Sequence, residues 1–148
     1  MKKTLIGLAL LSTIGSASAL DFGVGYSRDI SNDVNGVGIS VGESWKNFSL
    51  TASAERFDVA GGNHDQVSLI GGYQLIKVAG VAIEGQFGAS YITSDVAKDG
   101  LIGVVGLGAS MPLYRNISVT ADVRRNIGSG DMKVHDGTTA GLGLKYSF

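Results

Sequence analysis

The chain has 148 residues, which is short for more than one domain. It contains 23 glycines, one proline and no cysteine, and 12 basic residues stand against 13 acidic ones, for a formal net charge of -1. The lack of cysteine excludes a disulfide framework, a thiolate nucleophile and every cysteine-ligated metal site. The near-neutral charge provides no basic surplus for phosphate backbones, so nucleic acid is not expected as a partner.

Residues 1–19 have the three parts of a secretory signal peptide. A charged start with Lys2 and Lys3 is followed by an apolar stretch over residues 5–14 and by a cleavage motif of small residues that ends at Ala19. The apolar stretch is shorter than the roughly 20 residues that a permanent helical anchor needs. We therefore expect residues 1–19 to be cleaved on export and residues 20–148 to form the barrel domain described below.

From residue 20 onward, large apolar residues alternate with small or polar ones, and no stretch has a convincing helical period. This period of two predicts eight strands, near residues 20–28, 36–44, 48–57, 67–76, 80–91, 101–111, 117–127 and 138–148. Long connections alternate with tight turns, the long ones at residues 29–35, 58–66, 92–99 and 128–137. Strands joined in this way form an up-and-down meander, and eight of them can close and remove both sheet edges.

The alternation produces two chemically distinct faces. In the first strand, for example, Phe22 and Tyr26 share one face and Gly23 lies on the other. The sixth strand fits least well, because Ile102 and Val104 fall on the otherwise polar face.

Two kinds of barrel fit this pattern, a soluble one with its apolar face inside and a membrane one with its apolar face toward lipid. Glycine and serine suit a crowded, narrow interior, and the aromatic residues cluster near the strand ends, as in interfacial girdles. Tilted strands of about ten residues rise about 23 Å, close to the ~25 Å apolar band of membrane barrels. The sequence therefore predicts an all-β, eight-stranded, antiparallel, up-and-down transmembrane β-barrel.

With its signal peptide, eight amphipathic strands and a last strand ending in Tyr146-Ser-Phe148, the chain resembles the small outer-membrane barrels of Gram-negative bacteria. The nearest families are the OmpA-like, OmpX-like and opacity-type proteins, and the resemblance is architectural and selects no subfamily. It implies a location in the bacterial outer membrane. It also implies that Tyr146 and Phe148 are the signal recognised by the barrel-insertion machinery.

Charged residues recur on the face that would line the lumen. Unpaired charge is costly in so narrow a space, so we expect a network of Arg and Lys with Glu and Asp across it. The residues of this expected network are Glu55, Glu84, Asp122, Arg124 and Lys145. OmpA-like barrels have similarly filled interiors. An excess of acid and many inward glycines leave open the alternative of a narrow, cation-favouring pore. The inward charged residues are Asp21, Glu55, Glu84, Asp122, Arg124 and Lys145.

No catalytic, cofactor or metal site is expected. His64 and His135 fall in separate predicted loops, which would rise from opposite flanks of the barrel mouth, so a base, a nucleophile and metal ligands do not converge. Barrel enzymes that modify lipid A are the enzymatic alternative. That alternative is disfavoured because no histidine lies on a predicted strand.

Arg28, Arg56 and Arg125 share the apolar face at the long-loop ends of their strands, where they would meet head groups and can bind lipopolysaccharide phosphates. Snorkelling without specificity is the alternative. The long loops are acidic. The sequence thus predicts a non-enzymatic, monomeric barrel, either structural or surface-interacting. Its expected partners are outer-membrane lipid, lipopolysaccharide, the insertion machinery and a host or cell-surface ligand.

Overall fold

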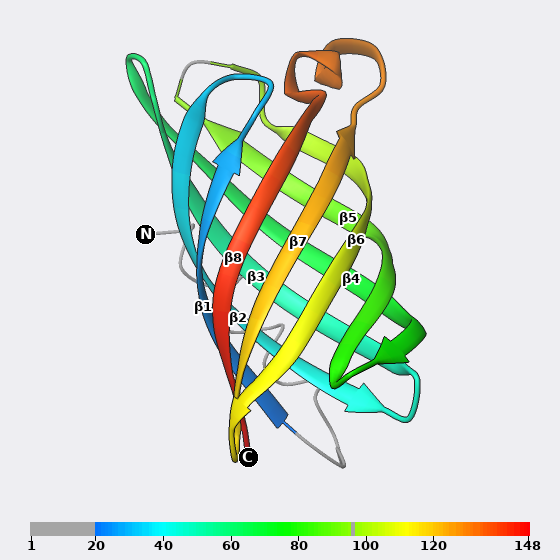
Figure 1. Ribbon diagram of the computed structural model, residues 1–148. Helices are drawn as coiled ribbons and strands as arrows, with labels where there is room; N and C mark the ends of the chain where they lie inside the picture. The colour runs from blue at the N-terminus through cyan, green and yellow to red at the C-terminus, as the bar shows by residue number, and fades with distance from the viewer. Residues whose placement is uncertain (1–19, 96) are drawn as a thin grey trace.

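The computed structural model describes residues 20–95 and 97–148, and the predicted signal peptide lies outside the described residues. The described chain forms strands throughout, with one short 3-10 helix between the last two (Figure 1). In chain order the elements are β1 (Leu20–Asp29), β2 (Val34–Trp45), β3 (Phe48–Val59), β4 (Gly62–Val78), β5 (Val81–Ser94), β6 (Gly100–Tyr114), β7 (Ile117–Ile127), η1 (Gly130–His135) and β8 (Gly137–Ser147).

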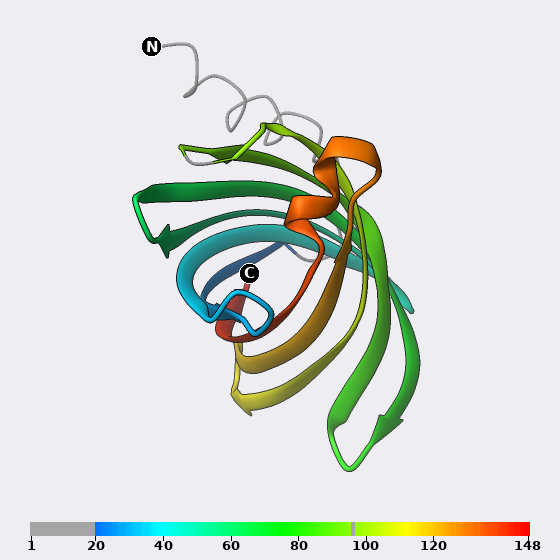
Figure 2. The ribbon, with the colours of Figure 1, turned by 90° about the horizontal axis from the view of Figure 1, so that it is seen from above.

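Every strand pairs antiparallel with its neighbours in the chain, and β1 also pairs with β8, which closes the sheet into a barrel. At this closing seam Phe22 lies opposite Tyr146. Figure 2, which looks along the barrel, shows the strands curving around its axis. Closure leaves no unpaired sheet edge, as a structure surrounded by lipid requires. The predicted eight-stranded, up-and-down topology is confirmed.

Large apolar side chains cover the outside of the barrel. Val37 and Phe87 are each 63% exposed and Leu142 is 65% exposed, and aliphatic and aromatic side chains on every strand share this outward face. A continuous apolar surface of this extent has no place in water but matches the acyl chains of a bilayer. The predicted orientation, with apolar residues outside, is confirmed. None of the helices among the described residues is long and apolar enough to cross a membrane.

Glycines face inward where a neighbouring strand carries a large lumen side chain. A Cβ at Gly38 would lie 2.6 Å from Cγ of Glu55, and one at Gly106 would lie 2.5 Å from the carbonyl oxygen of Val123 and 3.0 Å from Cγ of Arg124. These separations are too short for a real side chain. The inward glycines therefore make the space that Glu55 and Arg124 occupy.

The two ends of the barrel differ in their connections. At one end, residues 46–47, 79–80 and 115–116 make tight hairpin turns beside both ends of the barrel domain (Figure 1). Lys46, Ala79 and Arg115 have positive φ angles there, as such turns require. The connections at the other end are longer, apart from a two-residue turn, and include η1.

That two-residue turn corrects the expected long loop at residues 58–66. β3 continues to Val59 and β4 begins at Gly62, so only residues 60–61 connect them, and the hairpin projects at the upper left of Figure 1. Arg56 lies opposite Asp65, and its Nε donates a 2.7 Å hydrogen bond to that carboxylate. This cross-strand ion pair lets polar residues continue the ladder beyond the apolar belt.

Candidate functional site

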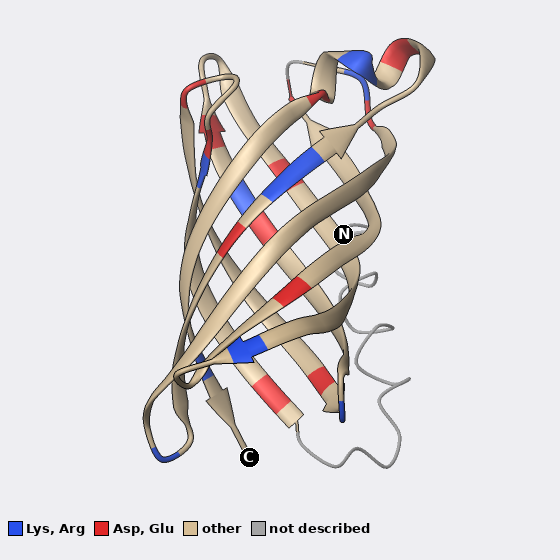
Figure 3. Cartoon of the chain, turned by 45° about the vertical axis from the view of Figure 1, so that its right-hand side comes forward, with Lys and Arg blue, Asp and Glu red and all other residues tan. Residues whose placement is uncertain are grey.

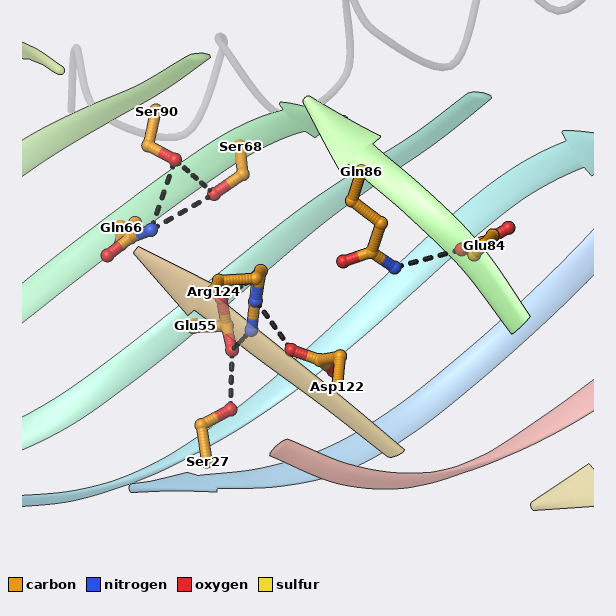
Figure 4. A network of polar contacts seen from close by, with 9 residues as sticks. All are labelled: Ser27, Glu55, Gln66, Ser68, Glu84, Gln86, Ser90, Asp122 and Arg124. Atoms are coloured by element: carbon orange, nitrogen blue, oxygen red, sulfur yellow. Dashed lines mark hydrogen bonds and ion pairs between the residues drawn. The ribbon is translucent and has the colours of Figure 1, made fainter. Parts of the chain in front are cut away.

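A group of buried charges meets around Arg124, which extends from β7 into the lumen and is 9% exposed. Its Nε donates a 2.7 Å hydrogen bond to Asp122, and its two terminal nitrogens donate bonds of 3.1 and 2.9 Å to the two carboxylate oxygens of Glu55 on β3. Ser27 of β1 donates a further 2.5 Å bond to Glu55 (Figure 4). A bidentate guanidinium-carboxylate pair of this kind holds β3 and β7 together across the lumen.

Glu84 lies apart from these charges. It accepts a 3.1 Å bond from Ser49 and a 2.8 Å bond from Gln86, and no Lys or Arg of residues 20–95 and 97–148 lies within salt-bridge distance of it. The Oε1 atom of Gln86 is buried and has no hydrogen-bond partner in the described part of the chain. Of the acids in the expected network, Arg124 therefore meets Glu55 and Asp122, whereas Glu84 is not paired with a cation among the described residues.

Lys145 instead pairs with Asp21 near the short-turn end. Its Nζ lies 3.1 Å from Oδ2 of Asp21. Oδ1 of Asp21 accepts a 2.5 Å hydrogen bond from Ser147, and Oδ2 accepts one of 3.3 Å from Ser44. The lumen charges thus fall into separate groups at different depths, as Figure 3 shows from outside the barrel.

Toward the end with the longer connections, which we call the upper end, the lumen is filled by side chains that the sequence analysis did not single out. Gln66 donates hydrogen bonds of 3.0 Å to Ser90 and 3.3 Å to Ser68, and the two serine hydroxyls lie 2.7 Å apart (Figure 4). Ile102 and Val104, the residues that broke the polar face of the sixth strand, do point inward and are each 2% exposed. We call this set the closed layer: Phe57, Gln66, Ser68, Ser90, Ile92, Ile102 and Val104.

Two cavities lie on either side of the closed layer. The lower cavity, of about 300 Å3, is lined by residues that include Asp21, Ser53 and Glu84. The upper cavity, of about 270 Å3, lies at the end of the barrel that carries the longer connections. The two cavities have no lining residue in common. The lining of the upper cavity includes Asp29, Val34, Phe57, Val59, His64, Gln66, Asn126, His135 and Thr139.

The expected separation of the two histidines is wrong. His64 lies on β4 with its side chain inward, because β4 begins earlier than predicted, and η1 brings His135 to within 5.2 Å of it, ring centre to ring centre. His135 is 6% exposed, and its Nε2 donates a 2.8 Å hydrogen bond to the backbone oxygen of Lys98. Among the described residues, no group of three or more His, Asp or Glu side chains could hold a metal ion.

His64 lies above the apolar belt, since its neighbour Asp65 already faces outward in an ion pair with Arg56. Burial lowers the pKa of His64, and the nearby His135 lowers it further, whereas Asp29 and Asp65 act in the opposite direction. The neutral imidazole is therefore the favoured form in the folded protein.

The three outward arginines lie at the long-loop ends of β7, β1 and β3. Arg28 forms a salt bridge with Asp33, Arg56 forms one with Asp65, and Arg125 donates a 3.2 Å hydrogen bond to Thr138. Several of the acidic loop residues accept hydrogen bonds from nearby backbone amides. These are Asp29 from Ser31 and Asn32, Asp95 from Asn63, Asp99 from Ser94, and Asp136 from Gly128.

At the opposite end of the barrel, Tyr146 and Phe148 lie on the outer surface. Their rings are 4.9 Å apart, edge to face, and the backbone amide of Phe148 donates a 2.9 Å hydrogen bond to Leu20. Both aromatic side chains are exposed, Phe148 to 75%. The residues proposed as the insertion signal are thus presented together beside the closing seam.

No family model and no curated protein matches the sequence. Solved structures do resemble it. The N-terminal β-barrel domain of Pseudomonas aeruginosa OprF has a TM-score of 0.72 at 16% identity, over 89% of this chain and 98% of that one. Neisserial surface protein A has a TM-score of 0.63 at 14% identity, over 88% and 96%. Ail of Yersinia pestis has a TM-score of 0.60 at 16% identity, over 90% of this chain and 100% of that one.

Identities this low show the fold. The chain has the closed, eight-stranded fold of small Gram-negative outer-membrane barrels, and the resemblance predicted from the sequence is confirmed at that level.

Proposed function

We propose that the protein is a non-enzymatic structural barrel of the outer membrane, with a closed lumen and with its longer connections at the cell surface. The observation that carries this proposal is the closed layer. Ile92 and Ser90 are 0% exposed there, and the other members are at most 4% exposed. A pore needs a continuous water path, and an apolar constriction resists wetting. A cation-favouring pore would require this layer to open.

The arrangement of hydroxyls and imidazoles supports a role without catalysis. An acyl-transfer site needs a hydroxyl held by a base that a third group orients. The buried hydroxyls of Ser68 and Ser90 bond to each other and to Gln66 instead. The imidazole of His64 faces the lumen, so it does not meet acyl chains on the outer surface, where a lipid A-modifying enzyme would act.

The proposal includes contact with lipopolysaccharide through Arg28, Arg56 and Arg125. Arg125 on β7 lies opposite Thr138 on β8. Strand β2 lies between the other two arginines, since Arg28 on β1 lies opposite Asn35 and Arg56 on β3 lies opposite Val37. The three guanidinium groups therefore follow one arc over β7, β1 and β3, at the level where lipid phosphates lie. Guanidinium groups bind phosphate well, while Asp33 and Asp65 compete for two of them.

A surface ligand is the further part of this proposal. A second structure of Ail, with a TM-score of 0.54 at 15% identity, contains the heparin analogue sucrose octasulfate. For the present chain, we propose that the same arginine arc and the surface connections are where an anionic host or cell-surface ligand would bind.

The structural role is tested by deleting the gene and measuring the sensitivity of the cells to detergent. A variant whose connections at residues 30–33, 60–61, 95–99 and 128–136 are replaced by short Gly-Ser turns should restore resistance fully, provided that heat-modifiable gel mobility shows a folded barrel. If the unaltered protein restores detergent resistance and the variant does not, a structural role is contradicted and the function belongs to the connections.

The lipopolysaccharide contact is tested by the phosphate content of the lipid that co-purifies with the barrel. Replacement of Arg28, Arg56 and Arg125 by Gln should reduce it, whereas Arg115→Gln at the opposite end should not. Equal phosphate content in all three proteins would reject specific binding in favour of snorkelling.

A further inference from the structure

The upper cavity is lined by polar side chains that form no hydrogen bond within the described part of the chain. Asn126 is 5% exposed and Thr139 is 4% exposed, and within residues 20–95 and 97–148 neither side chain has a hydrogen-bond partner. The ring nitrogens of His64 also have none in that part of the chain, and Gln66 uses its amide nitrogen on Ser68 and Ser90 and leaves its oxygen unused. Polar groups at the wall of a cavity are normally satisfied by water or a ligand, so this cavity is suited to a polar occupant.

Apolar and aromatic side chains form the rest of the wall. Phe57 packs edge-on against His64, with ring centres 5.8 Å apart, and Val34 and Val59 lie beside them. A purely apolar occupant would fit these surfaces, but it would leave Asn126 and Thr139 unsatisfied.

The charge of the cavity lining argues against an ionic occupant. No Lys or Arg is among the described residues that line it, and Asp29 is its one carboxylate. Both oxygens of Asp29 are already engaged, one by the backbone amides of Ser31 and Asn32 and the other by the Asn32 side chain. Anions and zwitterions therefore lack a counter-charge.

We propose that the upper cavity binds one neutral sugar ring, either a free hexose or the terminal residue of a glycan. The amide, hydroxyl and imidazole groups of Asn126, Thr139 and His64 can each donate and accept hydrogen bonds, as sugar hydroxyls do. They come from three strands, so they face a ring from several sides, while the C–H face of the ring packs against Phe57. The volume of about 270 Å3 equals roughly nine waters at about 30 Å3 each, which suits a single ring.

This site faces the outside of the cell if the longer connections lie at the cell surface, so this step rests on the proposed function. The lining residues come from the β1–β2, β3–β4, β5–β6 and β7–β8 ends, on the side of the barrel opposite the tight turns (Figure 1). The closed layer separates the cavity from the lower lumen. A sugar would therefore bind from the cell exterior and would not pass through the barrel.

The test is a titration of the membrane-extracted protein in lipid nanodiscs with methyl glucoside, methyl galactoside and N-acetylglucosamine, followed by protein NMR shifts and by saturation transfer to the ligand. Maltotriose distinguishes a glycan end from a free hexose. Glucuronate, nicotinamide and cyclohexanol are the anionic, flat heteroaromatic and weakly polar comparisons. At least one neutral pyranoside should bind saturably and more tightly than these three.

Matched variants assign the site. Thr139→Val and His64→Phe keep shape while removing polar atoms, and each should weaken binding about fivefold. Thr138→Val changes the adjacent, outward-facing threonine and should leave binding unchanged. The proposal is overturned if no neutral pyranoside binds saturably, if one of the three comparison compounds binds more tightly, or if Thr139→Val and His64→Phe both bind as the unaltered protein does.

Discussion

The upper and lower halves of the lumen are filled in different ways. In the closed layer, apolar side chains and a Gln-Ser-Ser cluster exclude water almost completely, as in the core of a soluble protein. Below it, glycines and small polar residues leave a cavity of about 300 Å3 in which carboxylates are held by a guanidinium, an ammonium or hydroxyls. A barrel that is apolar outside can therefore also contain an apolar core.

The largest effect is expected at Arg124, where the two halves meet. Arg124→Leu leaves Glu55 and Asp122 buried without their cation and should cost about 3–5 kcal/mol of unfolding free energy, measured by urea unfolding in lipid vesicles. Adding Glu55→Gln should recover part of this loss. The matched control Arg125→Leu faces outward and should cost less than about 1 kcal/mol. Equal losses for the two arginines would contradict the assigned burial.

The closed layer should be nearly as sensitive. Ile92→Ala removes a fully buried side chain and should cost about 2–4 kcal/mol in the same unfolding measurement. Ala82→Gly in the lower lumen is the comparison and should cost about 1 kcal/mol, because it removes little packing. A smaller loss for Ile92→Ala than for Ala82→Gly would mean that the upper lumen is not a packed core.

The lower ion pair should contribute less. Asp21 keeps its hydrogen bonds from Ser147 and Ser44 when Lys145 is replaced, and the Lys145 side chain is 31% exposed. Lys145→Met should therefore cost about 1 kcal/mol, and the exposed control Lys77→Met close to nothing. A loss as large as that of Arg124→Leu would show that the lumen around Lys145 is as strongly desolvated as it is around Arg124.

The smallest effect is a pH dependence at the upper cavity. The lowered pKa of His64 means that the unfolded chain takes up a proton more readily than the folded one. Stability should thus fall as the pH drops below the ordinary value of 6.5 and level off below the folded pKa. Unfolding at about pH 5 and about pH 7.5 should show this decrease, and His64→Gln should reduce it. An unchanged pH profile in that variant would contradict the assignment.

The sequence was sufficient for the strands, their faces and the barrel, because alternation is a local property that each strand carries by itself. It was insufficient for contacts across the lumen. Glu55 and Arg124 belong to strands that are not neighbours, and no local pattern pairs them. The hairpin over residues 58–66 was missed because its polar composition is typical of loops, whereas the Arg56–Asp65 pair keeps it in the ladder.

The anomaly of Ile102 and Val104 was the available signal for the closed layer. Pairing the predicted hairpins would have placed Ile102 opposite Ser90, at the level of the other buried residues. The contact between His64 and His135 had no such signal, since it depends on how η1 crosses the mouth of the barrel.

The closed lumen is tested most directly by single-channel recording of the purified protein in planar lipid bilayers. The account predicts no steady current from the unaltered protein, and a current from a variant that opens the closed layer, such as Ile92→Gly combined with Val104→Gly. A steady, cation-selective current from the unaltered protein that Glu84→Ala abolishes would contradict the account and establish a pore.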